Sequence, residues 1–474
     1  MKDTSLITDG SSCTRSGGRP ETPEARKVEE MEGAPRECGM SEKNASDAKR
    51  EDLLEKILDS GNLQRAYHRV CAKKGSAGVD GITTDGLLNQ LNEIGLEHLK
   101  EQIREGKYRP KPVLRVEIPK EGGKMRNLGI PRVLDRMVQQ AIAQVLSEIY
   151  EPEFCEYSYG FRPNRGAHDA LRQCLVNAND GYTWVMDMDL EQFFDTVNHS
   201  KLIQVLSEKV KDGRVISLVH KFLRAGVVVN GKYQKTEVGC PQGGNLSPIL
   251  ANILLNECDH ELMGRGHRFV RYADDMVIFC GSRKAAERTL DSTVRYLEQI
   301  LKLKVNREKT SISKLEGIGF LGYGFFYDGR TKEWDLRLHE KSEDKLKAKL
   351  KELTQRSNGW SVAYRQKKLN QLIRGWVGYF KLAKCKTSLR DIDQWLRRRI
   401  RMLYWKMWKR VRTRYRRLRK FGVEHQKAYE WANSRLGYWR VAHSWILSTT
   451  LDNRKLFELG WRWFSGLYAR ECVN

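Results

Sequence analysis

The most constraining feature of this sequence is a pair of adjacent aspartates between two apolar runs. Residues 272–275 are Tyr-Ala-Asp-Asp, and they separate Phe269 and Val270 from the apolar segment 276–279. Two apolar runs around a short polar turn predict two strands joined as a hairpin. Neighbouring carboxylates repel each other and lose hydration beside buried strands, a cost that a hard cation such as Mg²⁺ offsets. An ordinary turn is the alternative, because Asp is a favoured turn residue.

A second segment supplies further carboxylates. Residues 183–189 alternate, with Asp187 and Asp189 on one face of the expected strand and two methionines on the other. With Asp274 and Asp275 included, three or four carboxylates would then converge. Two-metal phosphoryl transfer needs such a cluster, in which one ion activates the attacking 3′ oxygen and the other stabilises the leaving pyrophosphate. The chemistry that these residues predict is nucleotide addition.

These segments resemble the palm of reverse transcriptases, in which an Asp precedes an aromatic residue by five positions and a Tyr-x-Asp-Asp turn supplies the other carboxylates. The matching residues are Asp189, Phe194, Asp274 and Asp275. The resemblance implies that the three aspartates are catalytic and bind two Mg²⁺ ions, for which Mn²⁺ can substitute. It also implies that Phe194 excludes a ribose 2′-hydroxyl, with core packing as the alternative or additional role. Asp187 lacks the aromatic residue at that spacing, and we interpret it as a neighbour of Asp189 outside the catalytic set.

A hairpin with cations is expected before the palm. Residues 116–131 form two short apolar segments around a Gly-Gly turn that brings two cations together. In similar enzymes a Lys and an Arg at these places hold the incoming triphosphate, which assigns that role to Lys120 and Arg126. Ion pairs on a solvated hairpin are the alternative. Upstream, the Gly-rich basic segment 73–81 carries a Gly-Val-Asp-Gly element similar to one that precedes the fingers of group II intron reverse transcriptases.

Two later segments also match the family. The loop 241–248 ends in a helix start, with Ser247 as the expected N-cap and a proline at the first helical position. The resemblance places Gln242 of this loop beside the incoming nucleotide. The second segment, residues 305–310, contains Lys309. The resemblance makes Lys309 a possible general acid for the leaving pyrophosphate, with a solvated lysine as the alternative.

The segment 158–165 interleaves aromatic rings with arginines. This composition suits stacking on bases and pairing with phosphates, so we expect Arg162 and Arg165 to contact nucleic acid.

Charge and composition limit the partners. The 474 residues carry a formal net charge of +25, with a pI near 9.6, which favours a polyanionic partner. No apolar run approaches the roughly 20 residues of a membrane span, and no charged-then-apolar leader opens the chain. The 10 cysteines include no Cys-x-x-Cys pair, which argues against a disulfide framework and a Cys-rich zinc site. We therefore expect a cytoplasmic protein without zinc.

The pattern becomes helical after the palm. Leu346, Leu350 and Leu353 form one stripe from residue 342 onward, and a second helix is expected to begin near Ser361. Residues 369–380 resemble the maturase-specific thumb of group II intron proteins. A plain amphipathic core helix is the alternative.

Residues 391–420 predict a long helix or a broken pair of helices with an unusually basic surface. Thirteen cations against two aspartates give this segment a net charge of 13 − 2 = +11. Nucleic-acid binding is favoured over a solvated face, because such a face usually mixes signs. We expect four arginines to contact nucleic acid: Arg412, Arg414, Arg416 and Arg417. The expected apolar stripe comprises Ile392, Leu396, Ile400, Leu403, Met407, Val411, Tyr415 and Leu418.

The expected fold is an α+β right-hand polymerase with helical fingers, an antiparallel palm sheet and a helical thumb. We expect a disordered leader over 1–48, fingers and palm over 49–335, a maturase thumb over 336–390, and a basic helical DNA-binding region over 391–474. No endonuclease segment of the paired-Cys or His-Asn-His kind follows. The chain thus resembles the endonuclease-lacking bacterial branch of group II intron proteins, with subclass C as the best match.

The resemblance implies an RNA-directed DNA polymerase and maturase that binds its group II intron RNA and assists splicing. It would copy the intron into cDNA during retrohoming, using a DNA target, a primer and dNTPs, as a bacterial cytoplasmic ribonucleoprotein. One alternative is a CRISPR-associated or other domesticated reverse transcriptase, although the usual fused domain is missing. Another is a splicing-only cofactor with a vestigial palm, against which the intact Asp189, Asp274 and Asp275 argue.

Overall fold

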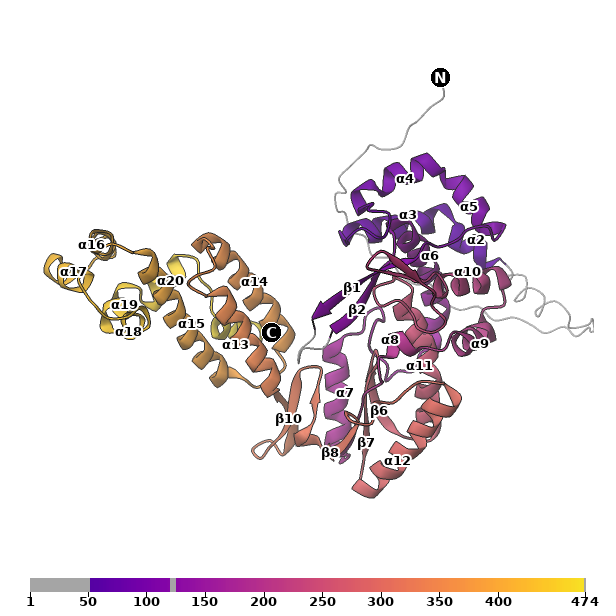
Figure 1. Cartoon of the computed structure of the whole chain (residues 1–474). Helices are drawn as coiled ribbons and strands as arrows, with labels where there is room; N and C mark the ends of the chain where they lie inside the picture. The colour runs from indigo at the N-terminus through magenta and orange to yellow at the C-terminus, as the bar shows by residue number, and fades with distance from the viewer. Residues whose placement is uncertain (1–51, 120–124, 473–474) are drawn as a thin grey trace, which may run out of the picture. The chain divides into compact units, whose positions relative to one another are not determined.

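The computed structural model describes residues 52–119 and 125–472 (Figure 1). The leader predicted over 1–48 and the predicted triphosphate ligand Lys120 lie outside the described residues. The fold is α+β, as the sequence predicts. Within the described ranges, no helix is both long enough and apolar enough to cross a membrane.

The first helices pack around one long buried helix. This helix, α6 (Val133–Tyr150), contacts α2 (Leu53–Leu58), α3 (Ser60–Ala72) and α4 (Leu87–Ile94), and α5 (Leu96–Arg104) contacts α4. The four aliphatic residues of α2 recur at helical spacing and are all buried: Leu53, Leu54, Ile57 and Leu58.

A four-stranded sheet follows in the order β2-β1-β4-β5. The predicted hairpin is confirmed: β1 (Val113–Pro119) and β2 (Met125–Ile130) pair antiparallel. β1 also pairs in parallel with β4 (Val227–Val229), which forms its own hairpin with β5 (Lys232–Gln234). This sheet therefore joins the hairpin 113–130 to residues 227–234, far along the chain.

The palm is a second four-stranded sheet, in the order β6-β7-β3-β8. Its strands are β3 (Trp184–Met188), β6 (Arg268–Tyr272), β7 (Asp275–Cys280) and β8 (Ser311–Lys314), and every pairing is antiparallel. The predicted β6–β7 hairpin and the predicted strand over 183–189 are both confirmed.

The alternation along the palm strands divides two hydrophobic clusters. Residues on one face join the cluster that includes the first helices, and residues on the other face join a cluster that extends into the C-terminal helices. The first set includes Met186, Met188 and Ile278, and the second includes Val185, Val277 and Phe279. Asp187 and Asp189 alternate with the two methionines, as predicted.

Three helices contact the palm strands: α7 (Ala167–Asn179), α11 (Ser247–Gly264) and α12 (Arg283–Arg295). The prediction that Ser247 caps α11 is wrong. Leu246 occupies the N-cap, and the Ser247 hydroxyl instead donates a hydrogen bond to the Pro241 carbonyl at 2.7 Å. α11 buries an apolar face that includes Leu250, Ile253, Leu254 and Cys258.

Short elements connect the two sheets, and a small third sheet follows the palm. The connecting helices are α8 (Phe193–Thr196), α9 (His199–Lys209) and α10 (Gly213–Leu223). The third sheet has the order β11-β10-β9 and consists of β9 (Gly319–Phe320), β10 (Tyr323–Asp328) and β11 (Glu333–Leu338).

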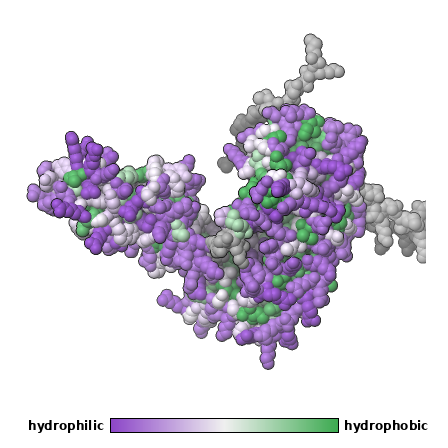
Figure 2. All heavy atoms as spheres, in the orientation of Figure 1, coloured by the Kyte–Doolittle hydropathy of each residue, from purple (hydrophilic) through white to green (hydrophobic). Residues whose placement is uncertain are grey.

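The remaining chain is helical, and its visible face is mostly hydrophilic (Figure 2). The predicted stripe of leucines is buried in α13 (Glu340–Leu353), and α14 (Val362–Phe380) begins near Ser361, as predicted. Ser361 caps α14 by accepting a hydrogen bond from the Tyr364 amide. Five short helices end the described chain: α17 (His425–Ala432), α18 (Tyr438–His443), α19 (Trp445–Thr450), α20 (Asn453–Glu458) and α21 (Phe464–Glu471).

The basic segment forms a broken pair of helices, α15 (Lys386–Met407) and α16 (Val411–Lys420). The predicted stripe is buried from Ile392 to Leu403, but the break turns Met407 and Val411 outward, so these two residues are 52% and 44% exposed. α15 also runs through residues 390 and 391. The thumb and the basic region therefore share one helix, and the boundary that we placed between them falls inside it.

Candidate active site

The Tyr-Ala-Asp-Asp segment forms the tight turn between β6 and β7. β6 ends at Tyr272 and β7 begins at Asp275, so Ala273 and Asp274 make the turn itself. Ala273 is buried and has φ +59°, in the left-handed region that L residues other than Asn and Asp rarely adopt. The turn is thus strained at one residue, directly before the two carboxylates.

The register of the two central strands, β3 and β7, brings the predicted catalytic residues to the same end of this strand pair. β3 and β7 run antiparallel with Met188 opposite Met276. Asp189 is the residue after Met188, and Asp275 is the residue before Met276, so both lie at the same end of the paired strands. Asp274 lies beside them in the turn. Segments 85 positions apart in the sequence therefore present their carboxylates at one place.

Asp189 has a cationic partner. The Lys309 ammonium lies 2.8 Å from its Oδ2 atom, and the Asp189 side chain is 31% exposed. The Asp189 carbonyl accepts a hydrogen bond from the Asn306 amide at 2.8 Å, and its amide donates to the Thr310 hydroxyl at 3.3 Å. The segment 306–310 thus packs against Asp189, and the predicted general acid Lys309 lies at the carboxylate cluster.

The carboxylates suit a hard cation in their chemistry and backbone positions, but their side chains are not yet gathered around one point. In the part of the chain that the structure describes, no three His, Cys, Asp or Glu side chains lie close enough together to hold a metal ion. The ion pair with Lys309 holds one oxygen of Asp189. Asp189, Asp274 and Asp275 remain the residues that would supply the oxygen ligands Mg²⁺ prefers.

Asp187 differs from Asp189 in its surroundings. Asp187 lies within β3 and pairs with the buried residue Val277, whereas Asp189 lies just beyond the end of the strand. Burial, and then the charge of Asp189, raise the pKa of Asp187 to about 6. This environment agrees with our interpretation of Asp187 as a neighbour.

Two predicted nucleotide ligands meet across 116 positions of sequence. Arg126 of β2 donates a hydrogen bond from Nε to Oε1 of Gln242 at 2.9 Å, and the Gly129 amide donates to the Gln242 carbonyl at 2.7 Å. Gly243 has φ +120°, and a Cβ atom there would lie 2.5 Å from the Gly129 carbonyl oxygen. Glycine therefore allows the loop 241–246 to lie directly against the hairpin.

Phe194 lies beside the same loop. Its carbonyl accepts a hydrogen bond from the Cys240 amide at 2.6 Å, two residues before Gln242. The ring is partly buried and contacts Phe193 edge to face, with the ring centres 5.2 Å apart. Phe194 therefore packs on the core while part of its side chain stays accessible, which is compatible with both roles predicted for it.

The two arginines of segment 158–165 take different places. Arg162 is 7% exposed and donates to the carbonyls of Cys155 and Ser158 at 2.6 and 2.9 Å, and it pairs with Glu151 at 2.8 Å. We therefore correct its assignment: Arg162 supports the chain internally. Arg165 is half-buried, lies over the Tyr159 ring at 5.6 Å and donates to the Glu156 carbonyl.

The four arginines predicted on α16 also divide. Arg412, Arg416 and Arg417 are exposed. Arg414 instead donates to the Trp408 carbonyl at 3.1 Å, and its guanidinium lies 4.5 Å from the centre of the Trp405 ring. We therefore correct Arg414 to a structural role in joining α16 to α15.

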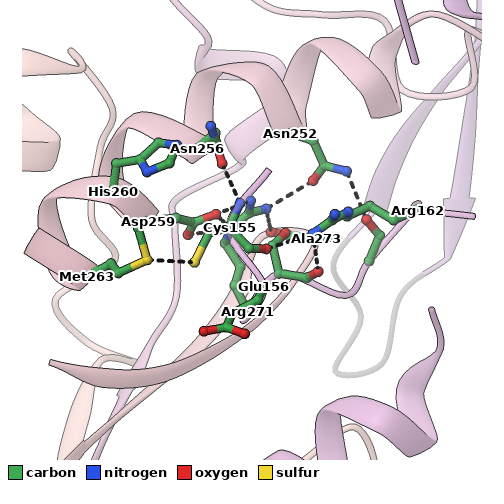
Figure 3. A network of polar contacts seen from close by, with 12 residues as sticks. Cys155, Glu156, Arg162, Asn252, Asn256, Asp259, His260, Met263, Arg271 and Ala273 are labelled. Carbon is green, nitrogen blue, oxygen red and sulfur yellow. Dashed lines mark hydrogen bonds and ion pairs between the residues drawn. The ribbon is translucent and has the colours of Figure 1, made fainter. Parts of the chain in front are cut away.

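The sequence interpretation missed the residues behind the turn 272–275: Arg271, Asp259 and Asn252 (Figure 3). Arg271 and Asp259 are both fully buried, and their closest atoms are 2.5 Å apart. A signal was present in the sequence, because Arg271 follows Phe269 and Val270 in a segment predicted to be a buried strand, where a charged residue needs a partner.

Comparisons with known proteins agree with this geometry. The family model for reverse transcriptase (RNA-dependent DNA polymerase) matches residues 118–325, and the model for the group II intron maturase-specific domain matches residues 344–422. The second match crosses residues 390 and 391, as helix α15 does.

Three curated relatives are similar. Protein YkfC of Escherichia coli is 35% identical over 312 residues, which cover 57% of this chain and 82% of YkfC. The putative COX1/OXI3 intron 2 protein of Saccharomyces cerevisiae is 32% identical over 60% of this chain and 40% of its own length. The group II intron-encoded protein LtrA of Lactococcus lactis is 34% identical over 52% of this chain and 40% of its own length.

Proposed function

The chain belongs to the family of group II intron reverse transcriptases and maturases, and from this premise we propose that it copies an intron RNA into DNA and assists the splicing of that RNA. The reverse transcriptase domain makes it an RNA-directed DNA polymerase. The observation that carries the proposal is the pairing of β3 with β7, which sets Asp189 beside the turn with Asp274 and Asp275.

In this proposal Asp189, Asp274 and Asp275 hold divalent metal ions, as members of the family use them. Two bound ions would supply an activated 3′ oxygen and charge stabilisation for the leaving pyrophosphate. Lys309 contacts only Oδ2 of Asp189, which leaves the other carboxylate oxygen for a metal ion. Release of Lys309 from Asp189 would free its ammonium to donate a proton to the leaving group.

The incoming nucleotide is held from the other side. Arg126 and Gln242 already contact each other at 2.9 Å and would bind the triphosphate and the base pair, together with Lys120. Phe194 lies next to the loop of Gln242 through the Cys240 amide, where its ring would exclude a ribose 2′-hydroxyl. Lys120 takes this role by resemblance alone.

The maturase part of the proposal rests on the second half of the chain. The maturase-specific match over 344–422 implies binding of intron RNA, and α16 presents Arg412, Arg416 and Arg417 to solvent. Arg165 is a further candidate contact. Insertion into a DNA target during retrohoming extends the same proposal, as does a bacterial cytoplasmic ribonucleoprotein. Assignment to subclass C stays a prediction, for which a group II ribozyme of that class flanking the gene is the test.

The proposal is tested with the purified chain in two assays. Extension of a DNA primer on an RNA template should require Mg²⁺ or Mn²⁺ and stop when the metal is chelated. Binding to the flanking intron RNA should exceed binding to an unrelated structured RNA of equal length. Intron binding without extension would indicate the splicing-only alternative, and extension without intron preference would indicate a domesticated reverse transcriptase.

A further inference from the structure

A buried arginine lies directly behind the catalytic turn. The Nε and Nη2 atoms of Arg271 donate to both oxygens of Asp259 on α11, at 2.5 to 3.0 Å. Its Nη1 atom donates to the Asn252 side chain and to the Ala273 carbonyl, each at 3.0 Å (Figure 3). The guanidinium of Arg271 therefore joins helix α11 to the turn of Ala273 and Asp274.

Stability alone is a poor explanation for this arrangement. Moving a charged pair out of water carries a large desolvation penalty, and well-packed apolar residues of similar size often leave a protein equally or more stable. Arg271 and Asp259 are nevertheless both fully buried. The pair supplies a hydrogen-bond donor for the Ala273 carbonyl, which apolar side chains cannot supply.

Ala273 has a conformation that needs such support. Its φ of +59° is unfavourable for a residue with a Cβ atom, and residues of this kind persist where their surroundings hold them. The carbonyl that Arg271 binds belongs to the peptide unit that joins Ala273 to Asp274. The hydrogen bond therefore acts on the backbone that aims the two carboxylates.

A second segment holds the turn from another side. The Arg271 amide donates to the Tyr157 carbonyl, and the Tyr159 amide donates to the Arg271 carbonyl, each at 2.9 Å. Asn252 donates to the Gly160 carbonyl at 2.8 Å, and a Cβ atom on Gly160 would lie 2.2 Å from the Ala273 amide nitrogen. Asn252 thus ties this segment to Arg271 while the missing Cβ lets it touch the turn.

We propose that Arg271 is a positioning residue for polymerisation: held by Asp259 and Asn252, it fixes Ala273 in its left-handed conformation and so aims Asp274 and Asp275. This inference rests on the proposed function, in which those two aspartates are catalytic. It adds a role for α11, which begins directly after the loop that carries Gln242. One helix thereby supports both the nucleotide side and the carboxylate side of the site.

The main test replaces the ion pair with apolar residues, in the double variant Arg271→Met with Asp259→Leu. We expect kcat for primer extension to fall roughly 10- to 100-fold, because small displacements of catalytic groups cost this much. KM for dNTP and affinity for the template-primer should stay unchanged, since Arg126 and Gln242 are not altered. The Mg²⁺ concentration for half-maximal rate should rise, and the variant should remain folded.

Arg271→Lys provides a second variant in case the double variant does not fold. It keeps a cation opposite Asp259 but replaces the planar, five-donor guanidinium with one ammonium, which cannot reproduce every bond of Arg271. We expect kcat to fall by less than in the double variant, and the Mg²⁺ dependence to shift in the same direction. Arg268→Met is the matched control, because Arg268 lies on the same strand but pairs with the exposed Asp180 at 2.5 Å.

Three outcomes decide the matter. A lower kcat and a higher Mg²⁺ requirement in folded Arg271 variants, with Arg268→Met unchanged, support positioning. An unchanged kcat and Mg²⁺ dependence in a folded Arg271 variant would overturn it and leave the network as structural support. Asp274→Asn separates this failure from failure of the proposed function, because an active Asp274→Asn enzyme would refute the catalytic assignment itself.

Discussion

The arginines of the palm and those of the basic helices have different partners. In and next to the palm, Arg271 pairs with Asp259 and Arg162 with Glu151, so each buried cation has a carboxylate beside it. Four arginines of α15 and α16 instead lie over aromatic rings: Arg397 over Trp463 at 5.1 Å, Arg398 over Trp439 at 4.0 Å, Arg399 over Trp395 at 5.0 Å and Arg414 over Trp405 at 4.5 Å.

The difference shows where the charge of the chain remains uncompensated. Among the described residues, no Lys or Arg between 391 and 420 lies within 4.0 Å of a carboxylate oxygen. A cation on an aromatic face keeps its full charge, whereas a cation paired with a carboxylate is locally neutral. The buried arginines of the palm therefore hold a local geometry, and the uncompensated charge of the basic helices supports our proposal that they bind a polyanion.

The largest expected effect separates the two regions by function. Asp274→Asn removes one carboxylate charge from the proposed metal site, so primer extension should fall by roughly 1,000-fold or more. Asp391→Asn, an exposed aspartate of α15, is the matched control and should extend at the wild-type rate. Steady-state primer extension measures both variants. Loss of intron RNA binding in folded Asp274→Asn would show that the two regions are not separable.

The next effect concerns nucleic-acid affinity. Replacing Arg412, Arg416 and Arg417 with Gln should weaken intron RNA binding by roughly tenfold or more and reduce the slope of log K against log salt by about 2. The control is the triple variant of Arg172, Arg283 and Arg307, which pair with Asp169, Glu287 and Glu298. Binding is measured over a range of salt concentrations. Equal effects of both triple variants would remove the distinction between compensated and uncompensated arginines.

A smaller effect is expected on sugar selection. Phe194→Ala opens space beside the loop of Gln242, so discrimination against ribonucleotides should fall by roughly tenfold or more. Phe193→Leu is the neighbouring control: Phe193 is 2% exposed, and its loss should lower stability without changing selectivity. The ratio of kcat/KM for a deoxynucleotide and its ribonucleotide gives the answer. An unchanged ratio in Phe194→Ala would leave core packing as its only role.

The smallest effect tests the correction within the basic helices. Arg414→Gln removes the bond to the Trp408 carbonyl and the contact with Trp405, so the free energy of unfolding should fall by about 1–3 kcal/mol. The exposed Arg412→Gln should change it by less than about 0.5 kcal/mol. Urea unfolding followed by circular dichroism compares the two. A larger loss for Arg412→Gln would reverse our assignment of these neighbours.

Local patterns predicted the palm well. The two apolar runs around residues 272–275 became β6 and β7, and the alternation over 183–189 became β3. These predictions succeed because strand pairing and alternation depend on nearby residues. The nucleotide-binding roles of Arg126 and Gln242 came only from the family resemblance, and the contact between these two residues was not predicted, since no local pattern joins positions 116 residues apart.

Other predictions failed where a side chain has a choice of partners. Interleaved rings and arginines fit both base stacking and internal packing, and Arg162 takes the second course. Likewise, a serine before proline suggests an N-cap, but the Ser247 hydroxyl finds the Pro241 carbonyl instead. The stripe through Met407 and Val411 followed from helical spacing without regard to where a break would fall, and the break at 408–410 rotates both residues outward. Each outcome depends on tertiary contacts that the local sequence does not contain.

The most direct test of the catalytic assignment compares two aspartates on one strand. Asp189→Asn and Asp187→Asn make the same chemical change two positions apart on β3, and Mg²⁺-dependent extension of a DNA primer on an RNA template is measured for each folded variant. Our account predicts that Asp189→Asn abolishes extension and Asp187→Asn retains it. Only Asp189 follows the C-terminal end of β3, where Asp274 and Asp275 also lie. Extension by Asp189→Asn, or its equal loss in Asp187→Asn, would contradict the account.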